Sequence, residues 1–300
     1  MDMKSIEYFL KVADEKSISR VAEGLYISQP ALSLQIKKLE EHYKQKFLIR
    51  TTKGVELTEA GVIFRRYAKN IHKLYQQSQE EMHQLNDSFE TIRIDANLTL
   101  ATYALPCMVH AMQEDPKFTD YLFDLTFSTD NSVEDNILFG ISDLGYVNRE
   151  KPNSALCHHL IGEDRLVLVA SPSYDTPDTI TVSELQNLNL IELYDKFQER
   201  PPLRESLESS GFQMSDFKVF MTLHSTESVK TCVFKGFGVS FLPFSSVKKE
   251  LSKNQLKEIH VSDFEESYPV YLVYLKENEN STKLADFISH LKVRKMIDFC

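Results

Sequence analysis

The stretch YISQPALSLQIKKLEEHYKQKFLIRTTKG, residues 26–54, constrains the fold most strongly, because it joins a helix start, a helix and a basic turn. Ser28 suits an N-cap, and Pro30 is tolerated in a first helical turn, where its missing N–H would have no intrahelical partner. The apolar residues that follow share one face at helical spacing: Leu32, Ile36 and Leu39. The stretch therefore predicts a helix with one buried face, followed by a turn at Gly54.

Two shorter amphipathic helices are predicted before this stretch. The first carries Ile6, Phe9, Leu10 and Ala13 on one face, and the second carries Val21, Ala22 and Leu25 after Ser17 or Ser19 as N-cap. Three short helices followed by the β-like alternation of RTTKGVELT are typical of a winged helix-turn-helix domain. We assign it to residues 1–58.

A longer helical pattern runs from Thr58 to about Phe89, and we assign residues 59–90 to a linker helix. Its apolar residues recur in steps of three and four, as in a coiled-coil seam, which predicts pairing with a second copy of the helix. Packing on its own domain is the alternative. The predicted dimerisation residues are Phe64, Tyr67, Ile71, Leu74, Met82 and Leu85.

After residue 90 the pattern changes to alternating strands and helices, which predicts a mostly parallel α/β sheet. Strands are predicted at 91–101, 121–129, 143–147, 164–170, 189–194, 217–223, 238–243 and 269–275, and helices at 105–112, 132–140, 182–188, 204–211, 225–236 and 281–296. The number of units favours two lobes with a cleft between them in residues 91–300. Lobe I is predicted at about 91–162 and 269–300, and lobe II at about 163–268.

The formal net charge of −10 is unevenly distributed. Residues 1–90 hold 14 Lys and Arg against 13 Asp and Glu, whereas the remainder holds 20 against 31. Within 33–53 there are six Lys and Arg against two Glu, so a basic patch for nucleic acid is predicted only here. There is no secretory start and no apolar run near the ~18 residues that span a bilayer, so we expect a cytoplasmic protein without membrane contact.

Catalytic and metal-binding signals are weak. The four cysteines form no CxxC pair, and adjacent residues such as Cys157–His159 do not easily converge on one ion, so neither a metal nor a cofactor is expected. There is no GxSxG, P-loop or GxGxxG after a strand, which argues against an enzyme with an N-terminal dimerisation module. A thiol-responsive regulator would need two cysteines that approach, and Cys157 and Cys232 are the candidates.

These segments together resemble the LysR-type transcriptional regulators over essentially the whole chain. The segments that carry the resemblance are YFLKVADEKSISRVAEGLYISQPALSLQIKKLE, FLIRTTKGVELTEAG, the LP at 105–106, GISDLGY at 140–146 and VFKGFGVSFLP at 233–243. The resemblance implies a homotetramer of paired dimers and a periplasmic-binding-protein-like effector domain. Tyr43 stands where the family usually has Gly at the end of the recognition helix, and Leu34 stands where many members have Arg.

The recognition helix would offer its N-terminal side chains to base edges, with Gln29 suited to adenine. The basic and hydroxyl side chains that come after these residues are suited to contacts with phosphate oxygens. The predicted DNA-binding residues are Ser28, Gln29, Pro30, Ser33, Lys37, Lys38, Arg50, Thr51, Thr52 and Lys53. Without the resemblance, an ordinary solvated helix and turn would be the alternative to a DNA-binding segment. A co-regulator that binds protein in place of DNA is disfavoured by the basic segment.

Polar strand-to-helix junctions predict the effector site, since helix N-termini hold anions well. Plain N-capping is the alternative for each hydroxyl, and the resemblance places the junctions on the cleft. The predicted effector-binding residues are Asn97, Thr99, Thr129, Ser132, Lys196, Arg200, Ser225 and Thr226. We expect a small, anionic metabolite that modulates promoter binding. The expected partners are double-stranded promoter DNA, this metabolite and further copies of the chain, with RNA polymerase as a candidate.

Overall fold

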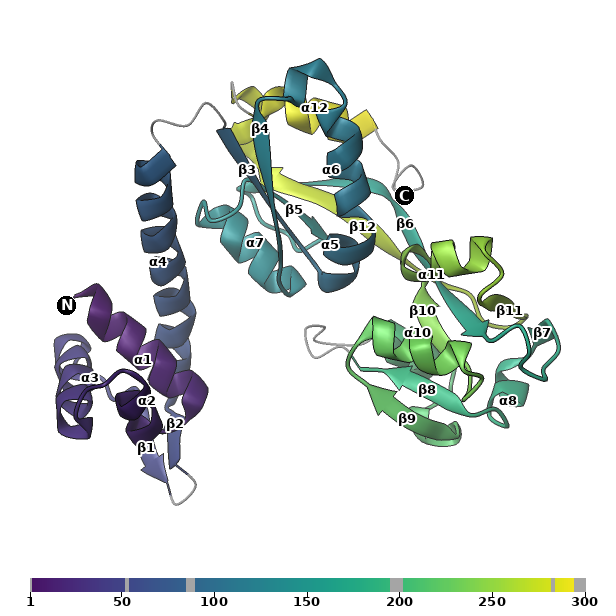
Figure 1. The fold of residues 1–300 in the computed structure, drawn as a ribbon, viewed down its shortest axis with the longest axis horizontal. Coiled ribbons are helices and arrows are strands. Elements are labelled where there is room, and N and C mark those ends of the chain that lie inside the picture. The colour runs from purple at the N-terminus through teal and green to yellow at the C-terminus, as the bar shows by residue number, and fades with distance from the viewer. Residues whose placement is uncertain (1, 52–53, 85–89, 195–201, 282–283, 294–300) are drawn as a thin grey trace. The chain divides into compact units, whose positions relative to one another are not determined.

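The computed structural model describes residues 2–51, 54–84, 90–194, 202–281 and 284–293, and it divides into compact units at 1–87 and 88–300. The first unit is a winged helix-turn-helix followed by a long helix (Figure 1). Its elements are α1 Met3–Glu15, α2 Ile18–Gly24, α3 Gln29–Tyr43, β1 Leu48–Thr51, β2 Gly54–Leu57 and α4 Glu59–Gln84. The three predicted short helices are confirmed, with Ser17 as the N-cap of α2 and Ser28 as that of α3.

Gly61 fixes the junction between the wing and α4. The backbone N–H of Gly61 donates to the Thr58 hydroxyl at 2.9 Å, so Thr58 caps the helix start. A Cβ atom at Gly61 would lie 2.1 Å from the carbonyl oxygen of Phe47, so a larger residue would displace backbone. The helix predicted from Thr58 begins one residue later, at Glu59, and the part of that prediction at 85–89 lies outside the described residues.

The second unit contains two α/β lobes joined by long strands. Its first part comprises β3 Glu90–Ala96, α5 Leu98–Tyr103, α6 Leu105–Gln113, β4 Tyr121–Phe127, α7 Asp130–Leu138, β5 Leu144–Val147 and β6 Leu156–Ala170. Then come β7 Thr179–Ile180, α8 Val182–Leu185, β8 Leu190–Leu193, α9 Pro202–Ser209, β9 Val219–Leu223, α10 Thr226–Phe234 and β10 Ser240–Pro243. The last are α11 Phe244–Ser252, β11 Lys257–Val261, β12 Glu266–Leu275 and α12 Ala285–Val293, and short 3₁₀ turns lie at Pro116–Phe118, Met214–Asp216 and Lys276–Asn280.

The main sheet is mixed, so the prediction of a mostly parallel sheet was wrong. Its strand order is β4-β3-β5-β12-β6-β11-β7, with β10 also paired to β6. The β3 pairs with β4 and β5 are parallel, but every pair made by β6 is antiparallel. The reason is that β6 and β12 are not crossover-connected neighbours: they lie side by side along their length and run from one lobe into the other (Figure 1).

Strand β6 starts at Leu156, eight residues before the predicted start at 164. The polar segment CHHLIGED has little apolar alternation, and its strand conformation comes from pairing with β12. The predicted strand 91–101 was also too long, because it ends at Ala96 and Asn97 begins a helix. Helix α11 and strand β11 were not predicted.

Each lobe has cores of its own. In lobe I, β3, β5 and β12 pack against α6 and α12 through residues that include Ile94, Leu105, Met108, Leu272 and Phe287. In lobe II, Leu168, Leu190, Val239 and Ile259 belong to one cluster, and a second cluster lies under α10 and α11. The separate cores allow the lobes to behave as two bodies that share β6 and β12.

Candidate functional site

The N-terminal end of α3 is exposed, whereas its middle is buried in the first unit. The Ser28 hydroxyl accepts a hydrogen bond from the Ala31 N–H at 3.3 Å, Gln29 and Pro30 are exposed, and Ser33 is half-buried. Leu32 is 0% exposed and packs with residues of α1 and α2. The first turn of α3 is therefore held firmly while its polar side chains face outward.

Of the predicted phosphate contacts, Lys37 and Lys38 are exposed, and Lys37 lies 3.5 Å from Glu41. In the wing, β1 pairs antiparallel with β2, and the Thr51 hydroxyl donates to the Gly54 carbonyl at 3.4 Å. The backbone of Arg50 pairs with Val55, but its side chain, together with Thr52 and Lys53, lies outside the described residues.

Tyr43 and Leu34, the two departures from the family pattern, lie in different surroundings. Leu34 is 52% exposed on α3, whereas Tyr43 packs its ring against Phe47 and Phe64. The helix nevertheless ends at Tyr43, because Lys44 adopts the left-handed conformation, with φ at 53°. The end that a glycine would provide is therefore made by a lysine.

Helix α4 carries an exposed apolar stripe that includes Tyr67, Ile71 and Met82, with exposed fractions of 44, 36 and 72%. Phe64 was predicted on this stripe, but it is 6% exposed and stacks on Phe47 with ring centroids 4.3 Å apart. We therefore reassign Phe64 to the core of its own unit. Leu74 is half-buried, and Leu85 lies outside the described residues.

In lobe I, the predicted effector residues lie at the carboxyl ends of parallel strands. Asn97 follows β3 and caps α5, its side chain accepting a hydrogen bond from the Leu100 N–H at 3.0 Å. Thr99 is half-buried in the first turn of α5. Thr129 follows β4 and caps α7, and its hydroxyl lies 2.9 Å from that of Ser132.

Asn148, which was not among the residues predicted from the sequence, connects the carboxyl ends of these strands through hydrogen bonds. It accepts a hydrogen bond from the Asn97 side-chain amide, and its N–H donates to the Asp130 carboxylate at 3.1 Å. Its side-chain amide donates to the Pro269 carbonyl on β12 at 3.0 Å. Burial raises the pKa of Asp130 above its ordinary value, and the hydrogen bond from Asn148 only partly offsets this effect. An Asn directly after a buried strand could have indicated this junction.

Ser225 and Thr226 begin α10 in lobe II, and a contact links this helix to lobe I. The Tyr103 hydroxyl at the end of α5 donates to the Glu227 carboxylate at 2.8 Å, and the Lys230 ammonium lies 5.1 Å from the Tyr103 ring centroid. Burial and the neighbouring Glu227 raise the pKa of Tyr103. Ser225 occupies the N-cap position of α10, but its side chain makes no capping hydrogen bond.

The cations proposed for the cleft cannot be placed as predicted. Lys196 and Arg200 lie outside the described residues. Arg204, a further cation considered for the cleft, is held by the buried Glu192, with its Nε donating at 2.9 Å. Its charge therefore serves an internal ion pair.

The cysteines considered for a thiol response and the histidine beside Cys157 have packing or hydrogen-bond partners within the lobes. Cys157 and Cys232 are free thiols, and they lie beside different core clusters, one in lobe I and one in lobe II. The imidazole of His158 lies 2.8 Å from the buried Glu134 carboxylate of α7. Within the described parts of the chain, no three His, Cys, Asp or Glu side chains come together as a metal site would require.

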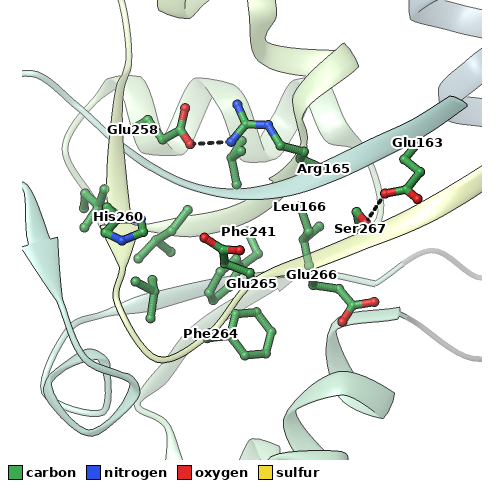
Figure 2. Close-up of a pocket in the computed structure, with 14 residues that line it drawn as sticks. Glu163, Arg165, Leu166, Phe241, Glu258, His260, Phe264, Glu265, Glu266 and Ser267 are labelled. Carbon is green, nitrogen blue, oxygen red and sulfur yellow. Dashed lines mark hydrogen bonds and ion pairs between the residues drawn. The ribbon is translucent and has the colours of Figure 1, made fainter.

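A pocket of about 420 Å³ lies in lobe II, and none of the predicted effector residues that the structure describes lines it. Figure 2 shows the side chains that line it. Leu166, Phe241 and Phe264 contribute apolar walls, and carboxylates lie at its rim. Two of these carboxylates have partners in the chain: Arg165 lies 3.1 Å from Glu258, and the Ser267 hydroxyl donates to Glu163 at 2.7 Å. The pocket therefore gives no indication of a particular ligand.

Comparison with known families agrees with this architecture. The family described as "Bacterial regulatory helix-turn-helix protein, lysR family" matches residues 3–62, and that described as "LysR substrate binding domain" matches residues 86–294. The chain belongs to the LysR family of DNA-binding transcriptional regulators. Because this family regulates transcription, the chain is not an enzyme.

Particular relatives cover nearly the whole chain. The HTH-type transcriptional regulator CitR of Bacillus subtilis is 27% identical in an alignment 296 residues long that covers 97% of this chain and 99% of CitR. A probable RuBisCO transcriptional regulator of Thalassiosira pseudonana is 28% identical, over 98% of this chain and 97% of its own length.

Solved structures share the fold. The LysR family regulator CbnR superimposes with a TM-score of 0.68 at 18% identity, over 97% of this chain and 98% of CbnR. CbnR complexed with its target DNA gives a TM-score of 0.67 at 19% identity, over 97% of this chain and 99% of that one. In this chain, no described helix is both long and apolar enough to cross a membrane.

Proposed function

We propose that the exposed N-terminal end of α3 reads promoter DNA while the wing and nearby cations hold the phosphates. The observation that carries this proposal is the contrast within α3: Leu32 is fully buried, whereas Gln29 and Pro30 point outward from a capped first turn. A recognition helix needs this arrangement, because its base-reading side chains must be free and its backbone must be rigid. Gln29 is the residue suited to a bidentate contact with adenine, and Ser33 follows it by one helical turn.

The phosphate-binding role goes to Lys37, Lys38, Arg50 and Lys53, with hydroxyls from Ser28, Thr51 and Thr52. The Ser28 hydroxyl accepts a hydrogen bond from the Ala31 N–H, so it can still donate its proton to a phosphate oxygen. The Thr51 hydroxyl donates its proton to the Gly54 carbonyl, so it would have to exchange that bond for one to a phosphate. Such contacts set affinity and its salt dependence without reading sequence.

Oligomer formation is proposed through the stripe on α4. Tyr67, Ile71 and Met82 expose apolar surface at coiled-coil spacing, and an identical helix would cover it. Pairing at α4 would present two copies of α3 to two half-sites. We also propose a tetramer of paired dimers and contact with RNA polymerase. Both proposals rest on the chain's membership of the LysR family of transcriptional regulators.

The effector is proposed to be a small anion held between the lobes at the start of α10. Helix α10 is the position that favours an anion, because the Ser225 side chain makes no capping bond there, whereas α5 and α7 are capped by Asn97 and Thr129. Free N–H groups at a helix start attract carboxylates and phosphates. Thr99 on α5 would contact the same molecule from lobe I.

Binding would regulate DNA contact by a population shift. The Tyr103–Glu227 hydrogen bond already joins the helices that carry Thr99 and Thr226, so a ligand at these helices would favour one arrangement of the lobes over another. In paired chains that shift would change the spacing or bending of the bound DNA.

A thermal-shift screen of carboxylates, phosphate and sulfate tests the effector proposal. An anion at about a hundred times its Kd should stabilise the second unit by about 2.7 kcal/mol, or several degrees in Tm. Thr99→Val should lose much of that increment, whereas Thr102→Val, an exposed threonine on the same helix, should keep it. Stabilisation by uncharged compounds alone would show that the effector is not an anion.

A further inference from the structure

Tyr26, in the turn between α2 and α3, combines an unusual backbone with an unusual exposure. Its φ is 54°, in the left-handed region, and its side chain is 97% exposed. The backbone around it is fixed by hydrogen bonds, with the Tyr26 N–H donating to the Glu23 carbonyl at 3.1 Å and the Ile27 N–H donating to the Ala22 carbonyl at 3.0 Å. The ring is therefore held outward from a rigid turn.

Left-handed backbone is unfavourable for a bulky side chain, and here no packing compensates for it. Among the described residues other than glycine, the left-handed ones are Lys16, Tyr26, Lys44 and Asn254. Lys16 and Lys44 close helices as C-caps, the backbone of Tyr26 closes α2 in the same way through the bonds to Glu23 and Ala22, and asparagine tolerates this region. Tyr26 alone of these four places an aromatic ring in solvent, so folding does not explain the choice of residue.

The position of Tyr26 relative to α3 suggests what the ring contacts. Tyr26 precedes Gln29 by three residues, so their Cα atoms lie at most about 11 Å apart. The major groove is about 12 Å wide. If Gln29 reaches the base edges, a side chain anchored within that distance can reach the sugar–phosphate strand that borders the groove.

We infer that Tyr26 is a DNA-contact residue, its hydroxyl donating to a phosphate oxygen and its ring packing on the adjacent deoxyribose. The inference rests on the proposed DNA-binding role of α3 and extends it to the turn. Tyrosine is one of the side chains that contact the DNA backbone. Because the phenol is neutral, this contact should add affinity without adding counterion release, unlike a contact from lysine or arginine.

Two substitutions separate this role from a structural one. Tyr26→Phe removes only the hydroxyl, and Tyr26→Asn removes the ring while keeping a residue that tolerates the left-handed region. Tyr174→Phe, in the second unit, is a matched control. Fluorescence anisotropy of the full chain is measured with labelled duplex from the DNA next to its gene, and with a random-sequence duplex of equal length, across a salt series.

Tyr26→Phe should weaken binding about three- to tenfold, as expected for one lost hydrogen bond, and Tyr26→Asn should weaken it further. The loss should be similar on both duplexes, the salt slope should stay at the wild-type value, and the Tm should not fall. Tyr174→Phe should bind as wild type.

Wild-type affinity in Tyr26→Asn would overturn the inference, as would a binding loss accompanied by a lower Tm, which would indicate a structural role. A loss limited to the promoter duplex would also overturn it, since it would indicate base reading. Failure of the broader DNA proposal is distinguishable, because wild type would then bind both duplexes equally. The random duplex would still report whether Tyr26 contacts the backbone.

Discussion

Glu40 illustrates how one side chain can organise the DNA-binding unit. It is 7% exposed, and its carboxylate accepts hydrogen bonds from the Phe47 and Leu48 N–H groups at 2.9 and 3.2 Å and from Lys46 at 2.7 Å. The sequence shows Glu40 only as one of two acidic residues in a basic segment. Its role depends on the chain turning back toward α3, which residue type and spacing do not reveal.

Phe64 and Tyr67 should separate folding from assembly. Phe64→Ala removes a ring that packs with Phe9, Phe47 and Tyr43, so it should lower the free energy of unfolding of the first unit by about 3–5 kcal/mol. Tyr67→Ala removes a ring that is exposed in the single chain, so it should change the free energy of unfolding of the unpaired first unit by less than about 0.5 kcal/mol. Hydrogen exchange resolved by peptide, on the full chain at a concentration where it is unpaired, measures both free-energy changes. Equal effects of the two variants would show that Phe64 is not a core residue.

Because Asp130 is buried, the wild-type second unit should gain stability relative to its Asp130→Asn variant as the pH falls. Burial raises the pKa of folded Asp130, so between the unfolded and folded pKa values the folded state binds more protons than the unfolded state. This contribution is present below the unfolded pKa and is lost as pH rises through the folded pKa. Wild type should therefore gain stability relative to Asp130→Asn as pH falls from about 7 to about 4. Denaturant titrations at several pH values would contradict this if the difference stayed constant.

Among the elements, helices with their own start signals were predictable, and strands that depend on partners were not. Ser17, Ser28 and Thr58 begin helices α2, α3 and α4 as local chemistry requires. By contrast, the first half of β6 is a strand because β12 pairs with it, and its register shifts between Val270 and Tyr271. Such pairing joins residues about 100 positions apart, so local pattern cannot specify it.

Helix α4 should assemble through one face. Ile71→Glu places a carboxylate on the apolar stripe, where a partner helix would bury it without a counter-charge, so self-association should weaken at least tenfold, about 1.4 kcal/mol. Lys73→Glu introduces the same residue about 200° around the helix and should leave association within about threefold of wild type. Sedimentation equilibrium compares them. Equal weakening by the two variants would place the interface elsewhere.

At the scale of the whole molecule, basic and acidic residues are concentrated in different parts of the chain. Basic residues cluster near α3 and the wing, while the acidic remainder forms the lobes. The function class and both units could be predicted from sequence because motif spacing is local. The junctions at Asn148 and Tyr103 could not, because they join strand ends and helices that meet only in the folded lobes.

Base reading by Gln29 is the central claim, and a double-mutant cycle tests it most directly. Each adenine of the footprinted promoter site is replaced in turn, and affinity at physiological salt is measured for wild type and Gln29→Ala. At one position the replacement should lower the DNA affinity of wild type about tenfold and leave the affinity of Gln29→Ala unchanged, as a bidentate contact predicts. If Gln29→Ala kept the full wild-type preference at every position, α3 would not read DNA through Gln29.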